Sequence, residues 1–136
     1  MAKKLDGKQC PTCFQGKLKH GVHETTFEYR GAVMHYKQQG AWCNHCDECI
    51  TTGTESEATS PQIRKFMAEV DNDEREFLLR VRKKLRLTQR QASRLTGGGH
   101  NAFSRYERGE AQPLPAVVNL FRLLDKHPEL VKELAA

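Results

Sequence analysis

Residues 97–109 read GGGHNAFSRYERG, and this segment says more about structure than any other part of the chain. On a helix, positions three, four and seven apart share one side. Four polar residues have that spacing: Asn101, Ser104, Arg105 and Arg108. Phe103 and Tyr106 point to the opposite side. Because asparagine pairs with adenine and arginine with guanine through two hydrogen bonds each, the segment predicts a helix with a core face and a DNA-reading face.

The flanking sequence predicts further short helices. One is expected in residues 74–87, a second after Thr88, which begins a capping box with the glutamine three residues later, and two more after Pro115 and Pro128. The triple glycine turns the chain before the helix described above, and Gly109 ends that helix. The five helices together predict a compact all-α domain of the helix-turn-helix class, with Phe103 and Tyr106 as core anchors.

The predicted DNA contacts are Asn101, Arg105, Ser104, Arg108, Thr88 and Gln89. Asn101 and Arg105 are expected to read base edges, because the N-terminal part of the second helix enters the major groove. Ser104 and Arg108 are expected to touch the DNA backbone. Thr88 and Gln89, at the start of the preceding helix, are expected to bind phosphate. The plainer alternatives are a helix N-cap for Asn101 and a solvent-exposed charge for Arg105.

The first half of the chain carries two Cys-x-x-Cys pairs, Cys10/Cys13 and Cys43/Cys46, separated by 29 residues. A two-residue spacer lets both sulfurs of a tight turn reach one ion, and four thiolates close a tetrahedral zinc site. The prediction is one structural Zn²⁺ per chain. Two alternatives involve neighbouring residues, since Cys49 or His45 could replace one of the four ligands. Gly16 is expected to relax the backbone as the chain leaves the first pair.

Two strands are expected between the cysteine pairs. Residues 25–30 and 33–36 alternate and are β-prone, and the intervening glycine predicts a tight turn between antiparallel strands. A domain of this size buries little apolar surface by itself. Zinc is therefore expected to supply much of its folding free energy.

A connecting segment is expected between the two halves. Ser60 and Pro61 resemble the start of a helix whose apolar stripe runs to Val70, and residues 71–73 (Asp-Asn-Asp) are expected to break it. The predicted organisation is a zinc domain in residues 1–56, a connecting helix and hinge in residues 57–72, and the helix-turn-helix domain in residues 73–136.

The charge is unevenly distributed along the chain. Residues 1–71 contain nine Lys or Arg and nine Asp or Glu, whereas residues 72–136 contain thirteen and eight. The whole net charge of +5 therefore lies in the second half, as expected where only that half meets a polyanion. No apolar run reaches the length of a membrane helix and the N-terminus does not read as a signal peptide. The expectation is a cytoplasmic protein with reduced cysteines and no membrane partner.

Residues 88–113 resemble the Xre/Cro family of helix-turn-helix domains, through the Leu-Thr-Gln start at residue 87 and the Ser-Arg-Tyr-Glu-Arg-Gly sequence at residue 104. The triple glycine departs from most of that family. The chain resembles the MqsA family of antitoxins over nearly its whole length. The resemblance rests on the triple glycine, on the spacing of the two cysteine pairs, on VRKKL at residues 81–85 and on LDKHPEL at residues 124–130.

The MqsA resemblance implies a two-domain antitoxin of a type II toxin–antitoxin system. It implies that the zinc domain engages a cognate ribonuclease toxin, and that the C-terminal domain dimerises and represses its own promoter through Asn101 and Arg105. Independently of the resemblance, Leu130, Val131 and Leu134 in the last predicted helix are expected to lie either on the dimer surface or in the core. Cys49 lies outside the family pattern.

Two other functions are compatible with parts of this pattern. The first is a stand-alone helix-turn-helix regulator whose zinc domain is only structural. The second is an enzyme, either a redox Cys-x-x-Cys protein or a zinc hydrolase. The sequence disfavours an enzyme, because no nucleophile, base and orienting group are visible together and a Cys₄ zinc site leaves no open coordination position.

Overall fold

The computed structural model describes residues 2–134, which divide after Met67 into two compact units. The elements of the N-terminal unit are η1 (Ala2–Leu5), β1 (Leu18–Tyr29), β2 (Ala32–Cys43), β3 (Cys49–Ile50) and the first part of α1 (Gly53–Lys84). The remainder of α1 belongs to the C-terminal unit with α2 (Gln89–Leu95), α3 (Ala102–Glu107), α4 (Pro115–Lys126), η2 (Pro128–Leu130) and α5 (Val131–Leu134). None of the described helices combines the length and apolarity needed to span a membrane.

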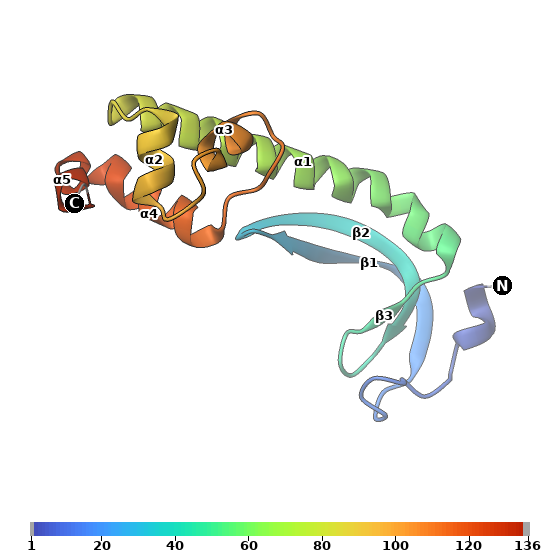
Figure 1. Ribbon diagram of the computed structural model, residues 1–136. Coiled ribbons are helices and arrows are strands. Elements are labelled where there is room, and N and C mark those ends of the chain that lie inside the picture. The colour runs from blue at the N-terminus through green and yellow to red at the C-terminus, as the bar shows by residue number, and fades with distance from the viewer. Residues whose placement is uncertain (1, 135–136) are drawn as a thin grey trace. The chain divides into compact units, whose positions relative to one another are not determined.

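The N-terminal unit is built on the hairpin of β1 and β2, which forms a long curved ribbon (Figure 1). Its register runs from Leu18 opposite Cys43 to Tyr29 opposite Ala32. The two residues between the strands, Arg30 and Gly31, have φ angles of 51° and 84°. Left-handed backbone at both central residues is the type I′ geometry that matches the twist of a hairpin. The predicted antiparallel strands and tight turn are confirmed, and both strands are longer than expected.

The start of α1 differs from the prediction. Residues 51–56 read as a turn and the helix is expected from Ser60, but it begins at Gly53. A capping box explains this, because the Glu55 N–H donates to Thr52 Oγ1 at 3.2 Å and the Thr52 N–H donates to Glu55 Oε1 at 2.9 Å. Pro61 consequently lies inside the helix rather than at its first turn.

The predicted hinge at residues 71–73 is wrong as a break in secondary structure, because α1 continues through it to Lys84. Aspartate and asparagine cost a helix only a few tenths of a kcal/mol each. Asn72 offsets part of that cost, since its side chain bonds Glu76 one turn ahead and also Arg75. A short polar run therefore predicts a helix end only where a glycine or proline supports it.

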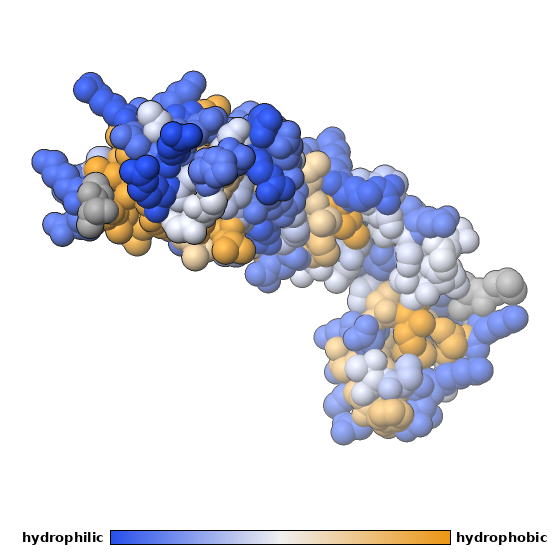
Figure 2. Space-filling view, viewed as in Figure 1, coloured by the Kyte–Doolittle hydropathy of each residue, from blue (hydrophilic) through white to orange (hydrophobic). Residues whose placement is uncertain are grey.

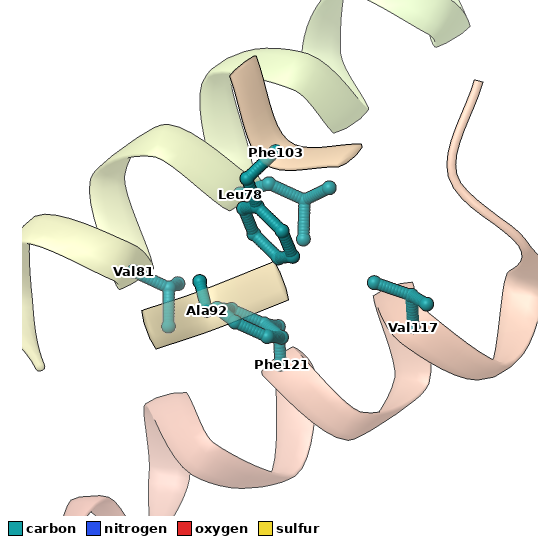
Figure 3. Close-up of a cluster of buried hydrophobic side chains, with 6 residues drawn as sticks. All are labelled: Leu78, Val81, Ala92, Phe103, Val117 and Phe121. Atoms are coloured by element: carbon teal, nitrogen blue, oxygen red, sulfur yellow. The ribbon is translucent and has the colours of Figure 1, made fainter. Parts of the chain in front are cut away.

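The C-terminal unit surrounds one apolar cluster, shown in Figure 3. Its buried members are Leu78, Val81, Ala92, Phe103, Val117 and Phe121. The Phe103 ring lies 5.1 Å from that of Phe121 and 5.3 Å from that of Tyr106, measured between centroids. Phe103 is fully buried and Tyr106 packs against the cluster. The prediction that these two aromatic residues anchor the helix to the core is confirmed.

The ends of the short helices follow the predicted signals. Thr88 caps α2 in a complete capping box with Gln91. Gly109 follows α3 with φ of 74°, and the Glu110 N–H bonds the Arg105 carbonyl at 2.9 Å, which is a Schellman ending. The last predicted helix is wrong in form, since the chain after Pro128 makes a 3₁₀ turn followed by a single α-helical turn.

Candidate metal centre and nucleic-acid interface

Four cysteine sulfurs meet at the base of the hairpin. Cys10 and Cys13 come from the loop before β1, Cys43 ends β2, and Cys46 lies in the loop after it. All four ligand atoms lie within 4.8 Å of one another, and the Cys10–Cys46 and Cys13–Cys43 sulfur pairs are each 3.7 Å apart. Sulfurs about 2.3 Å from a central ion at tetrahedral corners would be about 3.8 Å apart. The arrangement therefore fits a single tetrahedral metal ion.

Backbone N–H groups point at these sulfurs. The Thr12 N–H donates to Cys10 Sγ at 3.4 Å, the Gly16 N–H donates to Cys13 Sγ at 3.4 Å, and the His45 N–H donates to Cys43 Sγ at 3.3 Å. Such bonds stabilise thiolates, and the N–H groups of Gln15 and Gly16 lower the pKa of Cys13 to about 6. Four adjacent thiolates repel one another, so a divalent cation is what allows all four to ionise together.

The two alternative ligands lie outside the cluster. Among the described residues, the group close enough to hold one ion contains the four predicted cysteines and neither Cys49 nor His45. His45 contributes its backbone N–H, and its side chain is exposed. Cys49 lies in β3, where burial, then Glu55 and Glu48, raise the pKa of its thiol to about 11. A protonated, half-buried thiol is a poor ligand and a poor nucleophile.

Gly16 has a different role from the one expected. Its φ lies outside the left-handed region, but a Cβ placed on it would lie 2.3 Å from Cys43 Sγ and 2.8 Å from His45 Cβ. Glycine is needed here because the first cysteine loop packs directly on a sulfur of the second. Gly16 and Cys43 are far apart in the sequence, so this contact could not be predicted from the sequence.

We expect Gly16→Ala to weaken metal binding by about 10- to 100-fold, the range seen when groups around metal ligands are disturbed. Gly53→Ala is the matched control, because nothing lies within 4 Å of the position that its added methyl group would take and its φ lies outside the left-handed region. Competition with a chromogenic chelator measures both variants. Equal affinities for G16A and G53A would contradict the steric role of Gly16.

The predicted DNA-reading residues lie on the outer face of α3. Asn101 occupies the N-cap position of α3, as the plainer interpretation of this residue expects, although its side chain makes no capping hydrogen bond. Asn101 and Arg105 are exposed, and Ser104 is half-buried. Strongly hydrophilic residues gather over α2 and α3 on the face shown in Figure 2. Asn101 and Arg105 are thus accessible to solvent, whereas Phe103 of the same segment is fully buried.

The side chains at the start of α2 are already engaged within the protein. Thr88 Oγ1 accepts the Gln91 N–H at 3.0 Å, and Gln89 Nε2 donates to Glu107 Oε2 at 2.6 Å. The threonine hydroxyl keeps a proton to donate to a phosphate, whereas the glutamine amide is held against α3. Of the two predicted phosphate contacts, Thr88 is therefore the better placed.

Glu107 also forms a buried ion pair that was not expected from the sequence. Arg82 Nη2 lies 2.7 Å from Glu107 Oε1, and the two side chains are only 12% and 7% exposed. Arg82 Nη1 further donates to the Leu87 carbonyl at 2.9 Å. This network joins the end of α1, the start of α2 and the end of α3. Its partners are 25 and 18 residues apart, so no local sequence signal reveals it.

Comparison with known proteins identifies the family. The model of a family described as the antitoxin component of the bacterial toxin–antitoxin system, MqsA, matches residues 8–135. The chain belongs to the MqsA antitoxin family. Antitoxin MqsA of Escherichia coli strain K12 is 46% identical over an alignment of 129 residues, and the match covers 93% of this chain and 98% of that relative. The family expected from the sequence is confirmed.

A solved structure of the N-terminal domain of E. coli MqsA also aligns with part of this chain. It covers 47% of this chain and 97% of its own, at 34% identity and a TM-score of 0.45. The family match of residues 8–135 extends over both the cysteine cluster and α3. An antitoxin role therefore applies to the chain as a whole rather than to one of its units.

Proposed function

We propose that this MqsA-family antitoxin binds a ribonuclease toxin through its N-terminal domain and represses its own promoter through its C-terminal domain. The proposed domains are residues 1–56, 57–72 and 73–136, with residues 57–72 as a continuous helical connector. The structural ion is Zn²⁺, held by Cys10, Cys13, Cys43 and Cys46. One observation supports the DNA-binding part: Asn101 at the N-cap of α3 and Arg105 within it are both exposed, while Phe103 of the same helix is buried in the core.

The proposed base contacts follow from the chemistry of these two side chains. Within residues 2–134 no carboxylate lies within ion-pair distance of Arg105, and the Asn101 amide is free of the capping bond. Both side chains therefore keep their donors for base edges. Ser104, Arg108, Thr88 and Gln89 complete the contact surface on the DNA backbone. Repression follows from occupying the promoter.

A homodimer is proposed through the C-terminal unit. Leu130 and Leu134 are 43% and 37% exposed, and Leu123 on α4 is 57% exposed. Leucines with this exposure at the end of a small domain favour burial against a second copy. A two-fold dimer requires a palindromic operator whose half-sites are about one helical turn, or a multiple of it, apart.

We expect Asn101→Ala and Arg105→Ala each to weaken binding to DNA from upstream of this gene by about 1–3 kcal/mol. Gel-shift titration or fluorescence anisotropy measures the loss, and unchanged thermal unfolding shows that the fold is intact. Unrelated duplex DNA is the control, since lost base contacts alter its affinity much less than that of the operator. Parental affinity in both variants would refute the base-reading assignment.

The toxin part of the proposal has its own test. Expression of a ribonuclease-like protein encoded beside this gene should arrest growth, and co-expression of this chain should restore it and yield a co-purifying complex. Failure of both outcomes would favour the second candidate function, a stand-alone regulator. The family membership supports the antitoxin, and the accessible face of α3 is common to both candidates.

A further inference from the structure

We propose that Glu110 limits the affinity of the DNA-binding surface by holding Arg108 in an intramolecular ion pair. The inference rests on the DNA-binding function proposed above and adds a residue that opposes it. Arg108 Nη2 lies 3.1 Å from Glu110 Oε2, and Arg108 Nε donates to the Ser104 carbonyl at 3.2 Å. The guanidinium is therefore folded back onto the end of its own helix.

The backbone holds Glu110 in place for this contact. Gly109 turns the chain with a φ of 74°, and the Glu110 N–H bonds the Arg105 carbonyl at 2.9 Å. This Schellman ending fixes the Cα of Glu110 directly beyond the last turn of α3. The Glu110 carboxylate at that position lies next to the Arg108 guanidinium at the end of the helix.

Arg105 within α3 and Arg108 at its C-cap therefore present different local charge to DNA. Arg105 has no carboxylate partner among residues 2–134, whereas the charge of Arg108 is matched by Glu110. Both members of the pair are solvent-exposed, at 58% and 50% of their side-chain surface. An exposed ion pair is weak, so a phosphate can replace the carboxylate, although at a cost.

A phosphate and a carboxylate compete for the same planar donors of Arg108. If the phosphate takes them, the ion pair is lost. If the carboxylate keeps them, Arg108 makes no contact with the DNA backbone. Either outcome lowers affinity without regard to base sequence, because the contact lies on phosphate. Glu110 thereby reduces binding to all DNA, and leaves base discrimination to Asn101 and Arg105.

The test is Glu110→Gln in the full-length chain, measured on DNA from upstream of the gene and on an unrelated duplex of equal length. We expect affinity for both DNAs to rise about 2- to 5-fold, the range of an exposed ion pair. The slope of log K against log salt should steepen by about 0.9, as for one added phosphate contact. Glu57→Gln in the N-terminal unit is the control for net charge, because Glu57 is likewise exposed.

The double variant R108A/E110Q identifies the mechanism. Under the proposal it binds no more tightly than R108A alone. The proposal is overturned if E110Q leaves affinity unchanged, if E57Q gives the same increase, or if the increase survives removal of Arg108. A failure of the proposed DNA-binding function would give a different result from a failure of the Glu110 proposal. In that case the parent chain itself would show no preference for its upstream DNA over the unrelated duplex.

Discussion

Removal of the metal should unfold the N-terminal unit and leave the C-terminal unit folded. The buried apolar cluster of the N-terminal unit beside the metal site consists of Cys10, Leu18, Ala41 and Cys43, so two of its four members are ligands. Binding of structural zinc contributes about 10–16 kcal/mol in small zinc domains, which exceeds the whole stability of many domains. Without the ion, little apolar surface remains to hold the hairpin.

The single tryptophan makes this result measurable within the full-length chain. Trp42 is 9% exposed, and its Nε1 donates to the Gln38 carbonyl at 3.2 Å, so its fluorescence reports on the N-terminal unit. Chelation, or Cys13→Ser, should expose Trp42 while the helical circular dichroism of the C-terminal unit persists. Cys49→Ser should keep both the metal and the buried tryptophan. A chelated chain with unchanged fluorescence would show that the hairpin folds without metal.

Glu107→Ala should destabilise the C-terminal unit by about 3–5 kcal/mol, the cost of leaving one member of a buried ion pair without its partner. Arg82, which is 12% exposed in the parent structure, would lose the partner of its charge, and Gln89 would lose its acceptor. Glu110→Ala is the matched control, because its pair with Arg108 is exposed and exposed pairs contribute about 0–1 kcal/mol.

Hydrogen exchange of the amides of α4 measures this loss in the C-terminal unit alone. The double variant R82M/E107L should recover most of the stability, since apolar replacement removes both charges at once. A loss below about 1 kcal/mol for E107A, or no recovery in the double variant, would show that the pair is not a buried charge pair in solution.

The elements that could be predicted from the sequence are those with local signals. The capping box at Thr88, Gly109 at the end of α3 and the spacing of the cysteine pairs each act within a few residues. Phe103 and the outer face of α3 follow from helical periodicity. The four cysteines of the metal cluster could therefore be predicted as a group in space.

The missed features depend on context. The box of Thr52 and Glu55 is as local as that of Thr88, but the glycine between them reads as a turn, and this hid the start of α1. Contacts between distant segments, such as Arg82 with Glu107 or Gly16 with Cys43, have no local signal at all. These contacts arise only once the chain has folded.

Because Cys49 is packed and protonated, thiol alkylation can measure how much of the protein has metal bound. A Cβ on Gly40 would lie 2.5 Å from Cys49 Sγ, so this thiol fills the space that the glycine leaves in β2. With its pKa raised to about 11, it reacts slowly with alkylating reagents at neutral pH. A metal ion bound by Cys10, Cys13, Cys43 and Cys46 would protect these four thiols from the same reagents. Alkylation of the native chain, read by mass, thus distinguishes loaded molecules, which gain little or no label, from empty ones, which gain several.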